Sequence, residues 1–173
     1  STSGGQAEVL TQNSGIALNF HPRVSPNGKK IAFISDRLGQ NNLWVMDIDG
    51  SDQEAVFIDD VSRLASPEWA ADGSAIYAVR YFPSYSMHRR SGRIWRFPYK
   101  QPADHANEVI GEPSGFQALW PSTSSDGKYL YFMHSTFPGQ FNGRQRYQHV
   151  RRLDLASGAI SSITRGEGWD PSK

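Results

Sequence analysis

The chain has 173 residues, of which 38% are hydrophobic and 12% aromatic, a composition typical of a folded domain rather than of a disordered chain. The formal net charge is +1, so the overall charge gives no indication of a nucleic-acid-binding protein. There is no cysteine, and no apolar run approaches the roughly 20 residues that a membrane-spanning helix needs. We therefore expect a domain without disulfides or a membrane span, and no nucleic acid among its partners.

Residues 1–18 are rich in Ser, Gly and Asn around one short strand expected at 8–11, which resembles the outer strand of a preceding blade. After them, one pattern of strand, tight turn, strand, loop and strand occurs three times along the chain. The turn in each copy is an Asn or Asp followed by Gly, which favours a two-residue hairpin with positive φ at both residues. These turns are Asn27-Gly28, Asp72-Gly73 and Asp126-Gly127. Each turn is expected to join two antiparallel strands.

Four strands are predicted in each copy. The residues that directly follow the turns are apolar on both faces, as central strands covered on both sides should be. These central strands are expected at 31–34, 76–79 and 129–132. The third strands are expected at 43–46, 94–97 and 150–153, and more polar fourth strands at 53–58, 107–110 and 159–164.

The spacing of the repeat favours a β-propeller. The turn glycines lie 45 and then 54 residues apart, near the roughly 40–50 residues of a propeller blade. An ordinary β-sandwich would explain the hairpins, but not the same order of turn, central strand and aromatic strand in three copies. We predict an all-β fold, a β-propeller segment of three four-stranded antiparallel blades that is half of a six-bladed ring. The predicted parts are an outer strand of a preceding blade with a linker (1–18), blade 1 (19–60), blade 2 (61–112), blade 3 (113–165) and the start of a further blade (166–173).

Three blades do not close a ring, because closed propellers typically have four to eight blades. An open segment would expose two blade faces, and exposed apolar surface of that size marks an interface or an aggregation hazard. We therefore expect either a homodimer or further blades of a longer parent chain to complete the ring.

The first copy resembles the repeat of TolB-like propellers. Its Ser-Pro-Asn-Gly turn at 25–28 and its Val-Met-Asp-Ile-Asp-Gly segment at 45–50 are similar to the Ser-Pro-Asp-Gly and Val-Met-Asp-x-Asp-Gly turns of that family. The second copy has Ala70-Ala71 in place of Ser-Pro, and the third copy lacks the Pro. Further segments are most similar to the propeller that precedes an amidohydrolase barrel in some bacterial exported proteins; they lie at 20–26, 36–47, 80–82 and 152–158. The resemblance implies a periplasmic or secreted protein, in a family that serves several functions on one fold.

Two long connections join the second and third strands of blades 2 and 3, at 81–92 and 134–147. Long connections are often functional, and loops at equivalent positions emerge on one face of a propeller. Both combine aromatic residues with arginines, which are favoured at protein interfaces. We predict a docking surface for a protein partner or a companion catalytic domain, formed by Tyr81, Phe82, Tyr85, Arg89, Arg90, Phe137, Phe141 and Arg144. The alternative is that these aromatic residues only pack on their own blade.

No enzyme signature occurs in the sequence, since there is no Gly-x-Ser-x-Gly elbow, no His-Glu-x-x-His motif and no phosphate-binding glycine loop. His21 lies at the start of blade 1, where a side chain can face the central channel. A lone histidine there is more often hydrogen-bonded than a metal ligand, and no second histidine lies at metal-binding spacing. We therefore predict no catalytic residue, no metal site and no cofactor in this chain.

The predicted function is that of a non-catalytic scaffold or protein-interaction module. The alternative is the accessory propeller portion of an exported amidohydrolase or other hydrolase, whose catalytic domain lies outside this chain. A glycan-binding or small-ligand-binding propeller is a third possibility, because channel mouths are concave and collect polar groups.

Overall fold

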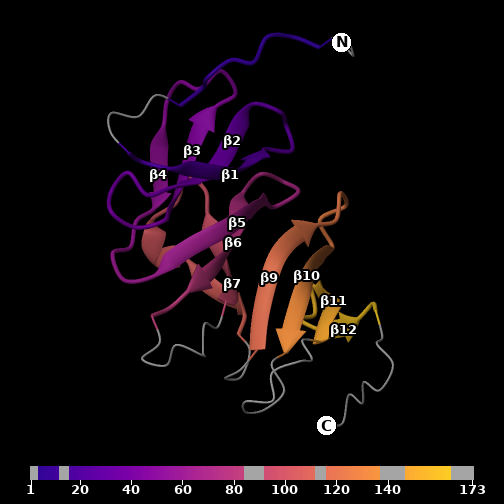
Figure 1. Ribbon diagram of the computed structural model, residues 1–173. Coiled ribbons are helices and arrows are strands. Elements are labelled where there is room, and N and C mark those ends of the chain that lie inside the picture. Colours follow the sequence, from indigo (N-terminus) through magenta and orange to yellow (C-terminus); the bar gives the residue numbers. More distant parts are fainter. Residues whose placement is uncertain (1–3, 12–15, 84–91, 112–115, 137–146, 165–173) are drawn as a thin grey trace.

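The computed structural model describes residues 4–11, 16–83, 92–111, 116–136 and 147–164. This part of the chain is all-β, with three four-stranded antiparallel sheets and one short 3-10 helix, as Figure 1 shows. Among these residues, no helix has the length and apolar character that crossing a membrane requires. The predicted all-β class and the three four-stranded blades are confirmed, and the three sheets do not close a ring.

Each sheet consists of four strands that follow one another in the chain, and we call the sheets blades 1, 2 and 3. Blade 1 contains β1 (Asn19–Val24), β2 (Lys30–Ser35), β3 (Asn42–Asp47) and β4 (Glu54–Phe57). Blade 2 contains β5 (Arg63–Trp69), β6 (Ala75–Tyr81), β7 (Gly92–Pro98) and β8 (Asn107–Ile110), with helix η1 (Ala103–His105) before β8. Blade 3 contains β9 (Phe116–Thr123), β10 (Tyr129–Thr136), β11 (Tyr147–Asp154) and β12 (Ile160–Ser162). This simple meander is the strand order of a propeller blade.

The predicted hairpins are present, but their turns differ from the prediction. Only the glycine of each turn has a positive φ, between +69° and +72° in the three copies. The Gly28 N–H donates to the Ser25 carbonyl oxygen at 2.9 Å, so the connection is a four-residue loop and not a two-residue primed turn. The Asn27 side chain explains the difference, because its Oδ1 accepts the Lys29 N–H at 3.1 Å and holds the loop from inside.

The apolar core lies between the blades, not within one sheet. Blade 1 packs on blade 2 through β5, and blade 2 packs on blade 3 through β9. Ile34 and Leu43, directly opposite each other in blade 1, are 0% exposed in the core that blades 1 and 2 share. Val79 and Ile94 are the same pair in blade 2, and they are 0% exposed in the core shared with blade 3. Each blade is therefore stabilised mainly by its neighbours.

The two end faces of the segment differ. On blade 1, a cluster around Phe33 and Trp44 is covered by Leu10 of the N-terminal segment. Residues 4–11, where an outer strand of a preceding blade was expected at 8–11, form no strand. On blade 3, the pair equivalent to Ile34 and Leu43 is Met133 and Val150, and Val150 is 40% exposed. Blade 2 covers the Ile34–Leu43 pair and blade 3 covers the Val79–Ile94 pair, but no further blade among the described residues covers Met133 and Val150.

Candidate functional site

The predicted docking surface is described only in part. Tyr81 is the last residue of β6, and Phe82 follows it. The Phe82 ring lies 6.0 Å from the Trp95 ring of its own blade, and the Arg80 guanidinium lies 4.6 Å above the Phe82 ring. Phe82 therefore contacts two side chains of its own blade. The other six residues of the predicted surface lie outside the described residues, so the docking surface stays a prediction; they are Tyr85, Arg89, Arg90, Phe137, Phe141 and Arg144.

Arg80 ties blade 2 to the connection that leaves blade 1. Its guanidinium stacks 5.0 Å from the Phe57 ring of β4 and 4.5 Å from the Trp95 ring. It donates to the Ser62 hydroxyl at 2.8 Å and forms an ion pair with Asp59. Burial alone would raise the pKa of Asp59, but hydrogen bonds from Ser62, the backbone and Arg80 outweigh it and lower that pKa to about 2. This contact is a structural link between blades.

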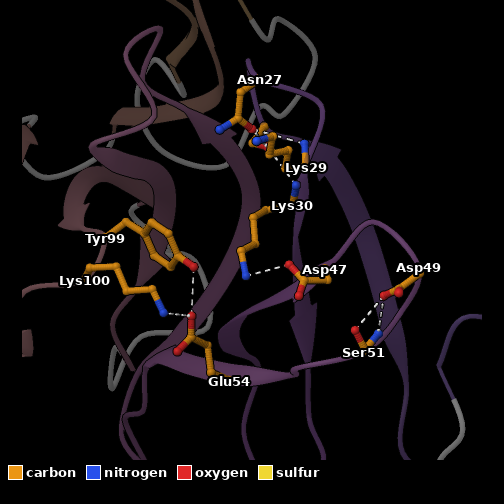
Figure 2. Close-up of polar contacts among 10 residues, drawn as sticks. Asn27, Lys29, Lys30, Asp47, Asp49, Ser51, Glu54, Tyr99 and Lys100 are labelled. Atoms are coloured by element: carbon orange, nitrogen blue, oxygen red, sulfur yellow. Dashed lines mark hydrogen bonds and ion pairs between the residues drawn. The ribbon is translucent and has the colours of Figure 1, made fainter.

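A second link lies at the turn edge, by which we mean the edge of the sheets that carries the three Asn/Asp-Gly turns. Figure 2 shows Lys100 and Tyr99 of blade 2 reaching Glu54 of blade 1. Lys100 Nζ lies 2.6 Å and the Tyr99 hydroxyl 2.8 Å from Glu54 Oε1. Within blade 1, Lys30 Nζ lies 2.6 Å from Asp47 Oδ1. The hydrogen bond from Lys100 lowers the pKa of Glu54 and raises the pKa of Lys100. Both lysines at this junction are therefore paired with a carboxylate: Lys100 with Glu54, and Lys30 with Asp47.

The corresponding junction between blades 2 and 3 contains an open groove of about 430 Å³, which we call the blade 2–3 groove. Its blade 2 side includes Asp72, Tyr77 and Arg96, and its blade 3 side includes Asp126 and Leu155. Tyr77 is only 5% exposed, and this burial raises the pKa of its hydroxyl, against the opposing effect of the neighbouring Arg96. Hydrogen bonds lower the pKa of Asp72 and of Asp126, so both carboxyl groups are ionised at neutral pH. The groove therefore combines one guanidinium, two carboxylates and an apolar wall.

The innermost strands share a strained feature that the sequence analysis did not predict. His21, Ser66 and Trp120 have φ of 54°, 51° and 50°, where each strand shifts its register against its neighbour. A proline follows each of them in the sequence, and this shared proline was the available signal. Trp120 is 61% exposed, so the bulge turns an indole ring toward solvent.

His21 is exposed on β1, and its Nδ1 accepts the Ser66 N–H at 3.2 Å. Partial burial and the nearby Arg23 lower its pKa, so the ring is neutral at pH 7. Among the described residues, no group of three or more His, Asp or Glu is arranged to hold a metal ion. The geometry of His21 therefore fits a contact between inner strands.

Comparison with solved structures identifies the architecture. A putative TolB from Agrobacterium tumefaciens matches 94% of this chain with a TM-score of 0.72 at 19% identity. TolB from Acinetobacter baumannii matches 91% with a TM-score of 0.62 at 20% identity. The fold is that of a TolB-like propeller. A prolyl endopeptidase structure also matches 96% of the chain with a TM-score of 0.69 at 21% identity.

The chain spans only part of these proteins: 54% of the Agrobacterium protein, 34% of the Acinetobacter protein and 25% of the prolyl endopeptidase. No family model and no curated protein sequence matches the chain. The likeness in structure confirms the predicted TolB-like propeller, and at these identities it is a statement about fold.

Proposed function

We propose that this chain is a non-catalytic segment of a TolB-like propeller that acts as a scaffold for protein association. The observation that carries the proposal is the Met133–Val150 pair on the outer face of blade 3. The equivalent pairs of blades 1 and 2 are fully buried by the next blade, whereas Val150 is 40% exposed. An apolar position built for blade packing and left open is a surface for another protein to cover.

We propose that the occupant is a second copy of this chain or the remaining blades of its parent, either of which would complete a propeller ring. Two three-bladed segments give the predicted six blades, a number within the range of closed propellers. The absence of enzyme motifs from the sequence supports a non-catalytic role. We also propose an exported, periplasmic or secreted, location, which rests on the TolB-like resemblance.

A second candidate function is that of the accessory propeller of a hydrolase whose catalytic domain lies outside these 173 residues. The similarity to a prolyl endopeptidase supports this candidate, because a quarter of that chain matches nearly all of ours. The companion amidohydrolase barrel is a more specific version that rests on sequence resemblance alone. Expressing the parent protein with and without this segment, and measuring hydrolase activity, separates an accessory role from an independent module.

The scaffold proposal is tested by placing charges on the exposed face. The double variant Met133→Lys/Val150→Lys should prevent association and leave the fold intact, because an unpaired charge in a blade interface is costly. The control is Leu38→Lys, which changes an apolar residue of 57% exposure away from this face. Size-exclusion chromatography should show loss of the associated form for the double variant only. An unchanged elution profile would overturn association of this chain through the outer face of blade 3.

The predicted docking surface on the long loops has its own test. Replacing Arg89, Arg90 and Arg144 together by Ala should weaken binding to a companion domain once that domain is at hand. If the triple variant binds the companion domain as tightly as the wild-type chain does, the two loops do not form the proposed docking surface.

A further inference from the structure

The blade 2–3 groove can be compared with the equivalent place between blades 1 and 2, because the repeat aligns the two junctions residue by residue. The Tyr99 N–H donates to the Ser74 carbonyl oxygen at 2.9 Å, and the Leu155 N–H donates to the Lys128 carbonyl oxygen at 2.9 Å. Leu155 is therefore the blade 3 counterpart of Tyr99.

The residues before the turns align in the same way. Trp69 ends β5, and the Ala70 N–H after it donates to the Ala75 carbonyl oxygen at 2.9 Å. In blade 3 the Ser124 N–H makes the same bond to the Tyr129 carbonyl oxygen, also at 2.9 Å. Ser124 follows Thr123, so Thr123 is the counterpart of Trp69.

Between blades 1 and 2, two aromatic rings close the junction. The rings of Trp69 and Tyr99 pack edge to face with their centres 5.3 Å apart. Trp69 is 4% exposed, and the Tyr99 hydroxyl donates to Glu54 at 2.8 Å. The Tyr99 ring thus fills this site, and the Glu54 carboxylate accepts the hydrogen bond from its hydroxyl (Figure 2).

Between blades 2 and 3, the two rings are replaced by Thr123 and Leu155, and the groove of about 430 Å³ is present. On the blade 2 side, Tyr77 and Arg96 fill part of the space that the two missing rings would occupy. The equivalent positions of blade 1 carry the smaller residues Ala32 and Val45. The Tyr77 side chain is buried, whereas Arg96 is half-buried, so Arg96 is the more accessible of these two lining residues.

The charges of the groove select a neutral ligand. Arg96 is positive, Asp72 and Asp126 are negative, and Lys128 Nζ lies 3.7 Å from Asp126 while remaining 70% exposed. The four charges balance, so neither a carboxylate nor an amine is favoured by net charge. The planar guanidinium of Arg96 can stack on the face of an aromatic ring. The two carboxylates can accept a hydrogen bond from an O–H or N–H group at the edge of that ring.

We propose that the blade 2–3 groove binds a tyrosine or tryptophan side chain presented by a protein partner, in the way that Tyr99 occupies the junction between blades 1 and 2. The ring would lie against Leu155 and the Arg96 guanidinium, and its O–H or N–H would donate to Asp72 or Asp126. This inference gives the proposed scaffold a specific recognition site, and it rests on that function only for the source of the side chain.

The test uses small probes, so it does not depend on knowing the partner. N-acetyltyrosinamide is titrated into the isotope-labelled chain while backbone amide signals are followed by NMR. We expect shifts at Ser74, Arg96, Ser125 and Gly127, with a dissociation constant on the order of 1 mM for a single side chain. N-acetylleucinamide and N-acetyllysinamide should bind at least about tenfold more weakly, because neither supplies an aromatic face. Equal binding of either control would overturn the proposal.

A variant that fills the groove and its matched control complete the experiment. Leu155→Tyr restores the residue found in blade 2 and should abolish the shifts by filling the groove. Its matched control is Ile48→Tyr, which places the same ring at the equivalent position of blade 1, where Ile48 is 47% exposed, and should leave binding unchanged. If Leu155→Tyr does not fold, Thr123→Trp makes the other exchange and should have the same effect.

Two results would overturn the groove proposal. One is binding of N-acetyltyrosinamide that persists in Leu155→Tyr. The other is the absence of binding for every probe at a concentration on the order of 20 mM, 20-fold above the expected dissociation constant. Neither result touches the scaffold proposal, whose test is association through the outer face of blade 3.

Discussion

Replacing Asp59 by Asn should remove most of a pH-dependent link between blades 1 and 2. The Asp59 side chain is 13% exposed and is paired with Arg80, which is 14% exposed. Its pKa falls from 3.8 to about 2 in the folded protein, which corresponds to about 2 kcal/mol of stability at pH 7. Because the folded-state pKa is the lower one, this contribution is complete above about pH 5 and is lost as the pH falls toward 2. About half of it remains at pH 3.

The assay is urea denaturation of the wild-type chain and of Asp59→Asn at pH 7 and at pH 3. The difference in unfolding free energy should be about 2 kcal/mol at pH 7 and about 1 kcal/mol at pH 3. Asp60→Asn, which changes the exposed neighbouring carboxylate, serves as the control and should alter stability by less than about 0.5 kcal/mol. A difference for Asp59→Asn that stays constant between the two pH values would refute the electrostatic account of this link.

Four further substitutions probe the packing of the blades. Gly28→Ala should lower the unfolding free energy by about 1 kcal/mol, because of backbone strain at φ +71°. Gly50→Ala should lower it by at least about 1 kcal/mol more, because its Cβ would lie 2.6 Å from the Leu10 carbonyl oxygen. Equal losses in urea denaturation would mean that the N-terminal segment does not rest on blade 1. Phe97→Ala should cost about 3–5 kcal/mol, because Phe97 is 1% exposed between blades 1 and 2, and a loss under about 1 kcal/mol would contradict an inter-blade core. Lys100→Met should change stability by less than about 1 kcal/mol, since the side chain is 60% exposed, and a larger loss would give this ion pair more weight than its exposure allows.

The blades could be predicted from the sequence because their signals are local. Apolar runs on both faces marked the central strands, and the glycine of each turn marked the hairpins, as at Gly28. The turn geometry was wrong because the Asn27 side chain competes for the backbone N–H of Lys29, which a dipeptide rule does not include. Strand bulges at His21, Ser66 and Trp120 were missed although a proline follows each residue, because the register shift itself also depends on the neighbouring strand.

The blade 2–3 groove could not be predicted from any single motif. The exchange of Trp69 for Thr123 and of Tyr99 for Leu155 is visible when the copies are aligned. Whether such an exchange leaves a groove depends on the facing blade, where Tyr77 and Arg96 return only part of the volume. That balance is a property of packing between sheets, so it required the three-dimensional structure.

The propeller account is tested most directly by the molar mass of the chain in solution, from light scattering on a size-exclusion column at two concentrations. The partly exposed Met133–Val150 pair predicts association, and a mass of twice the 19.3 kDa of one chain is expected at the higher concentration. A stable, well-folded monomer of 19.3 kDa at micromolar and higher concentrations would contradict the account, because the outer face of blade 3 would then need no partner.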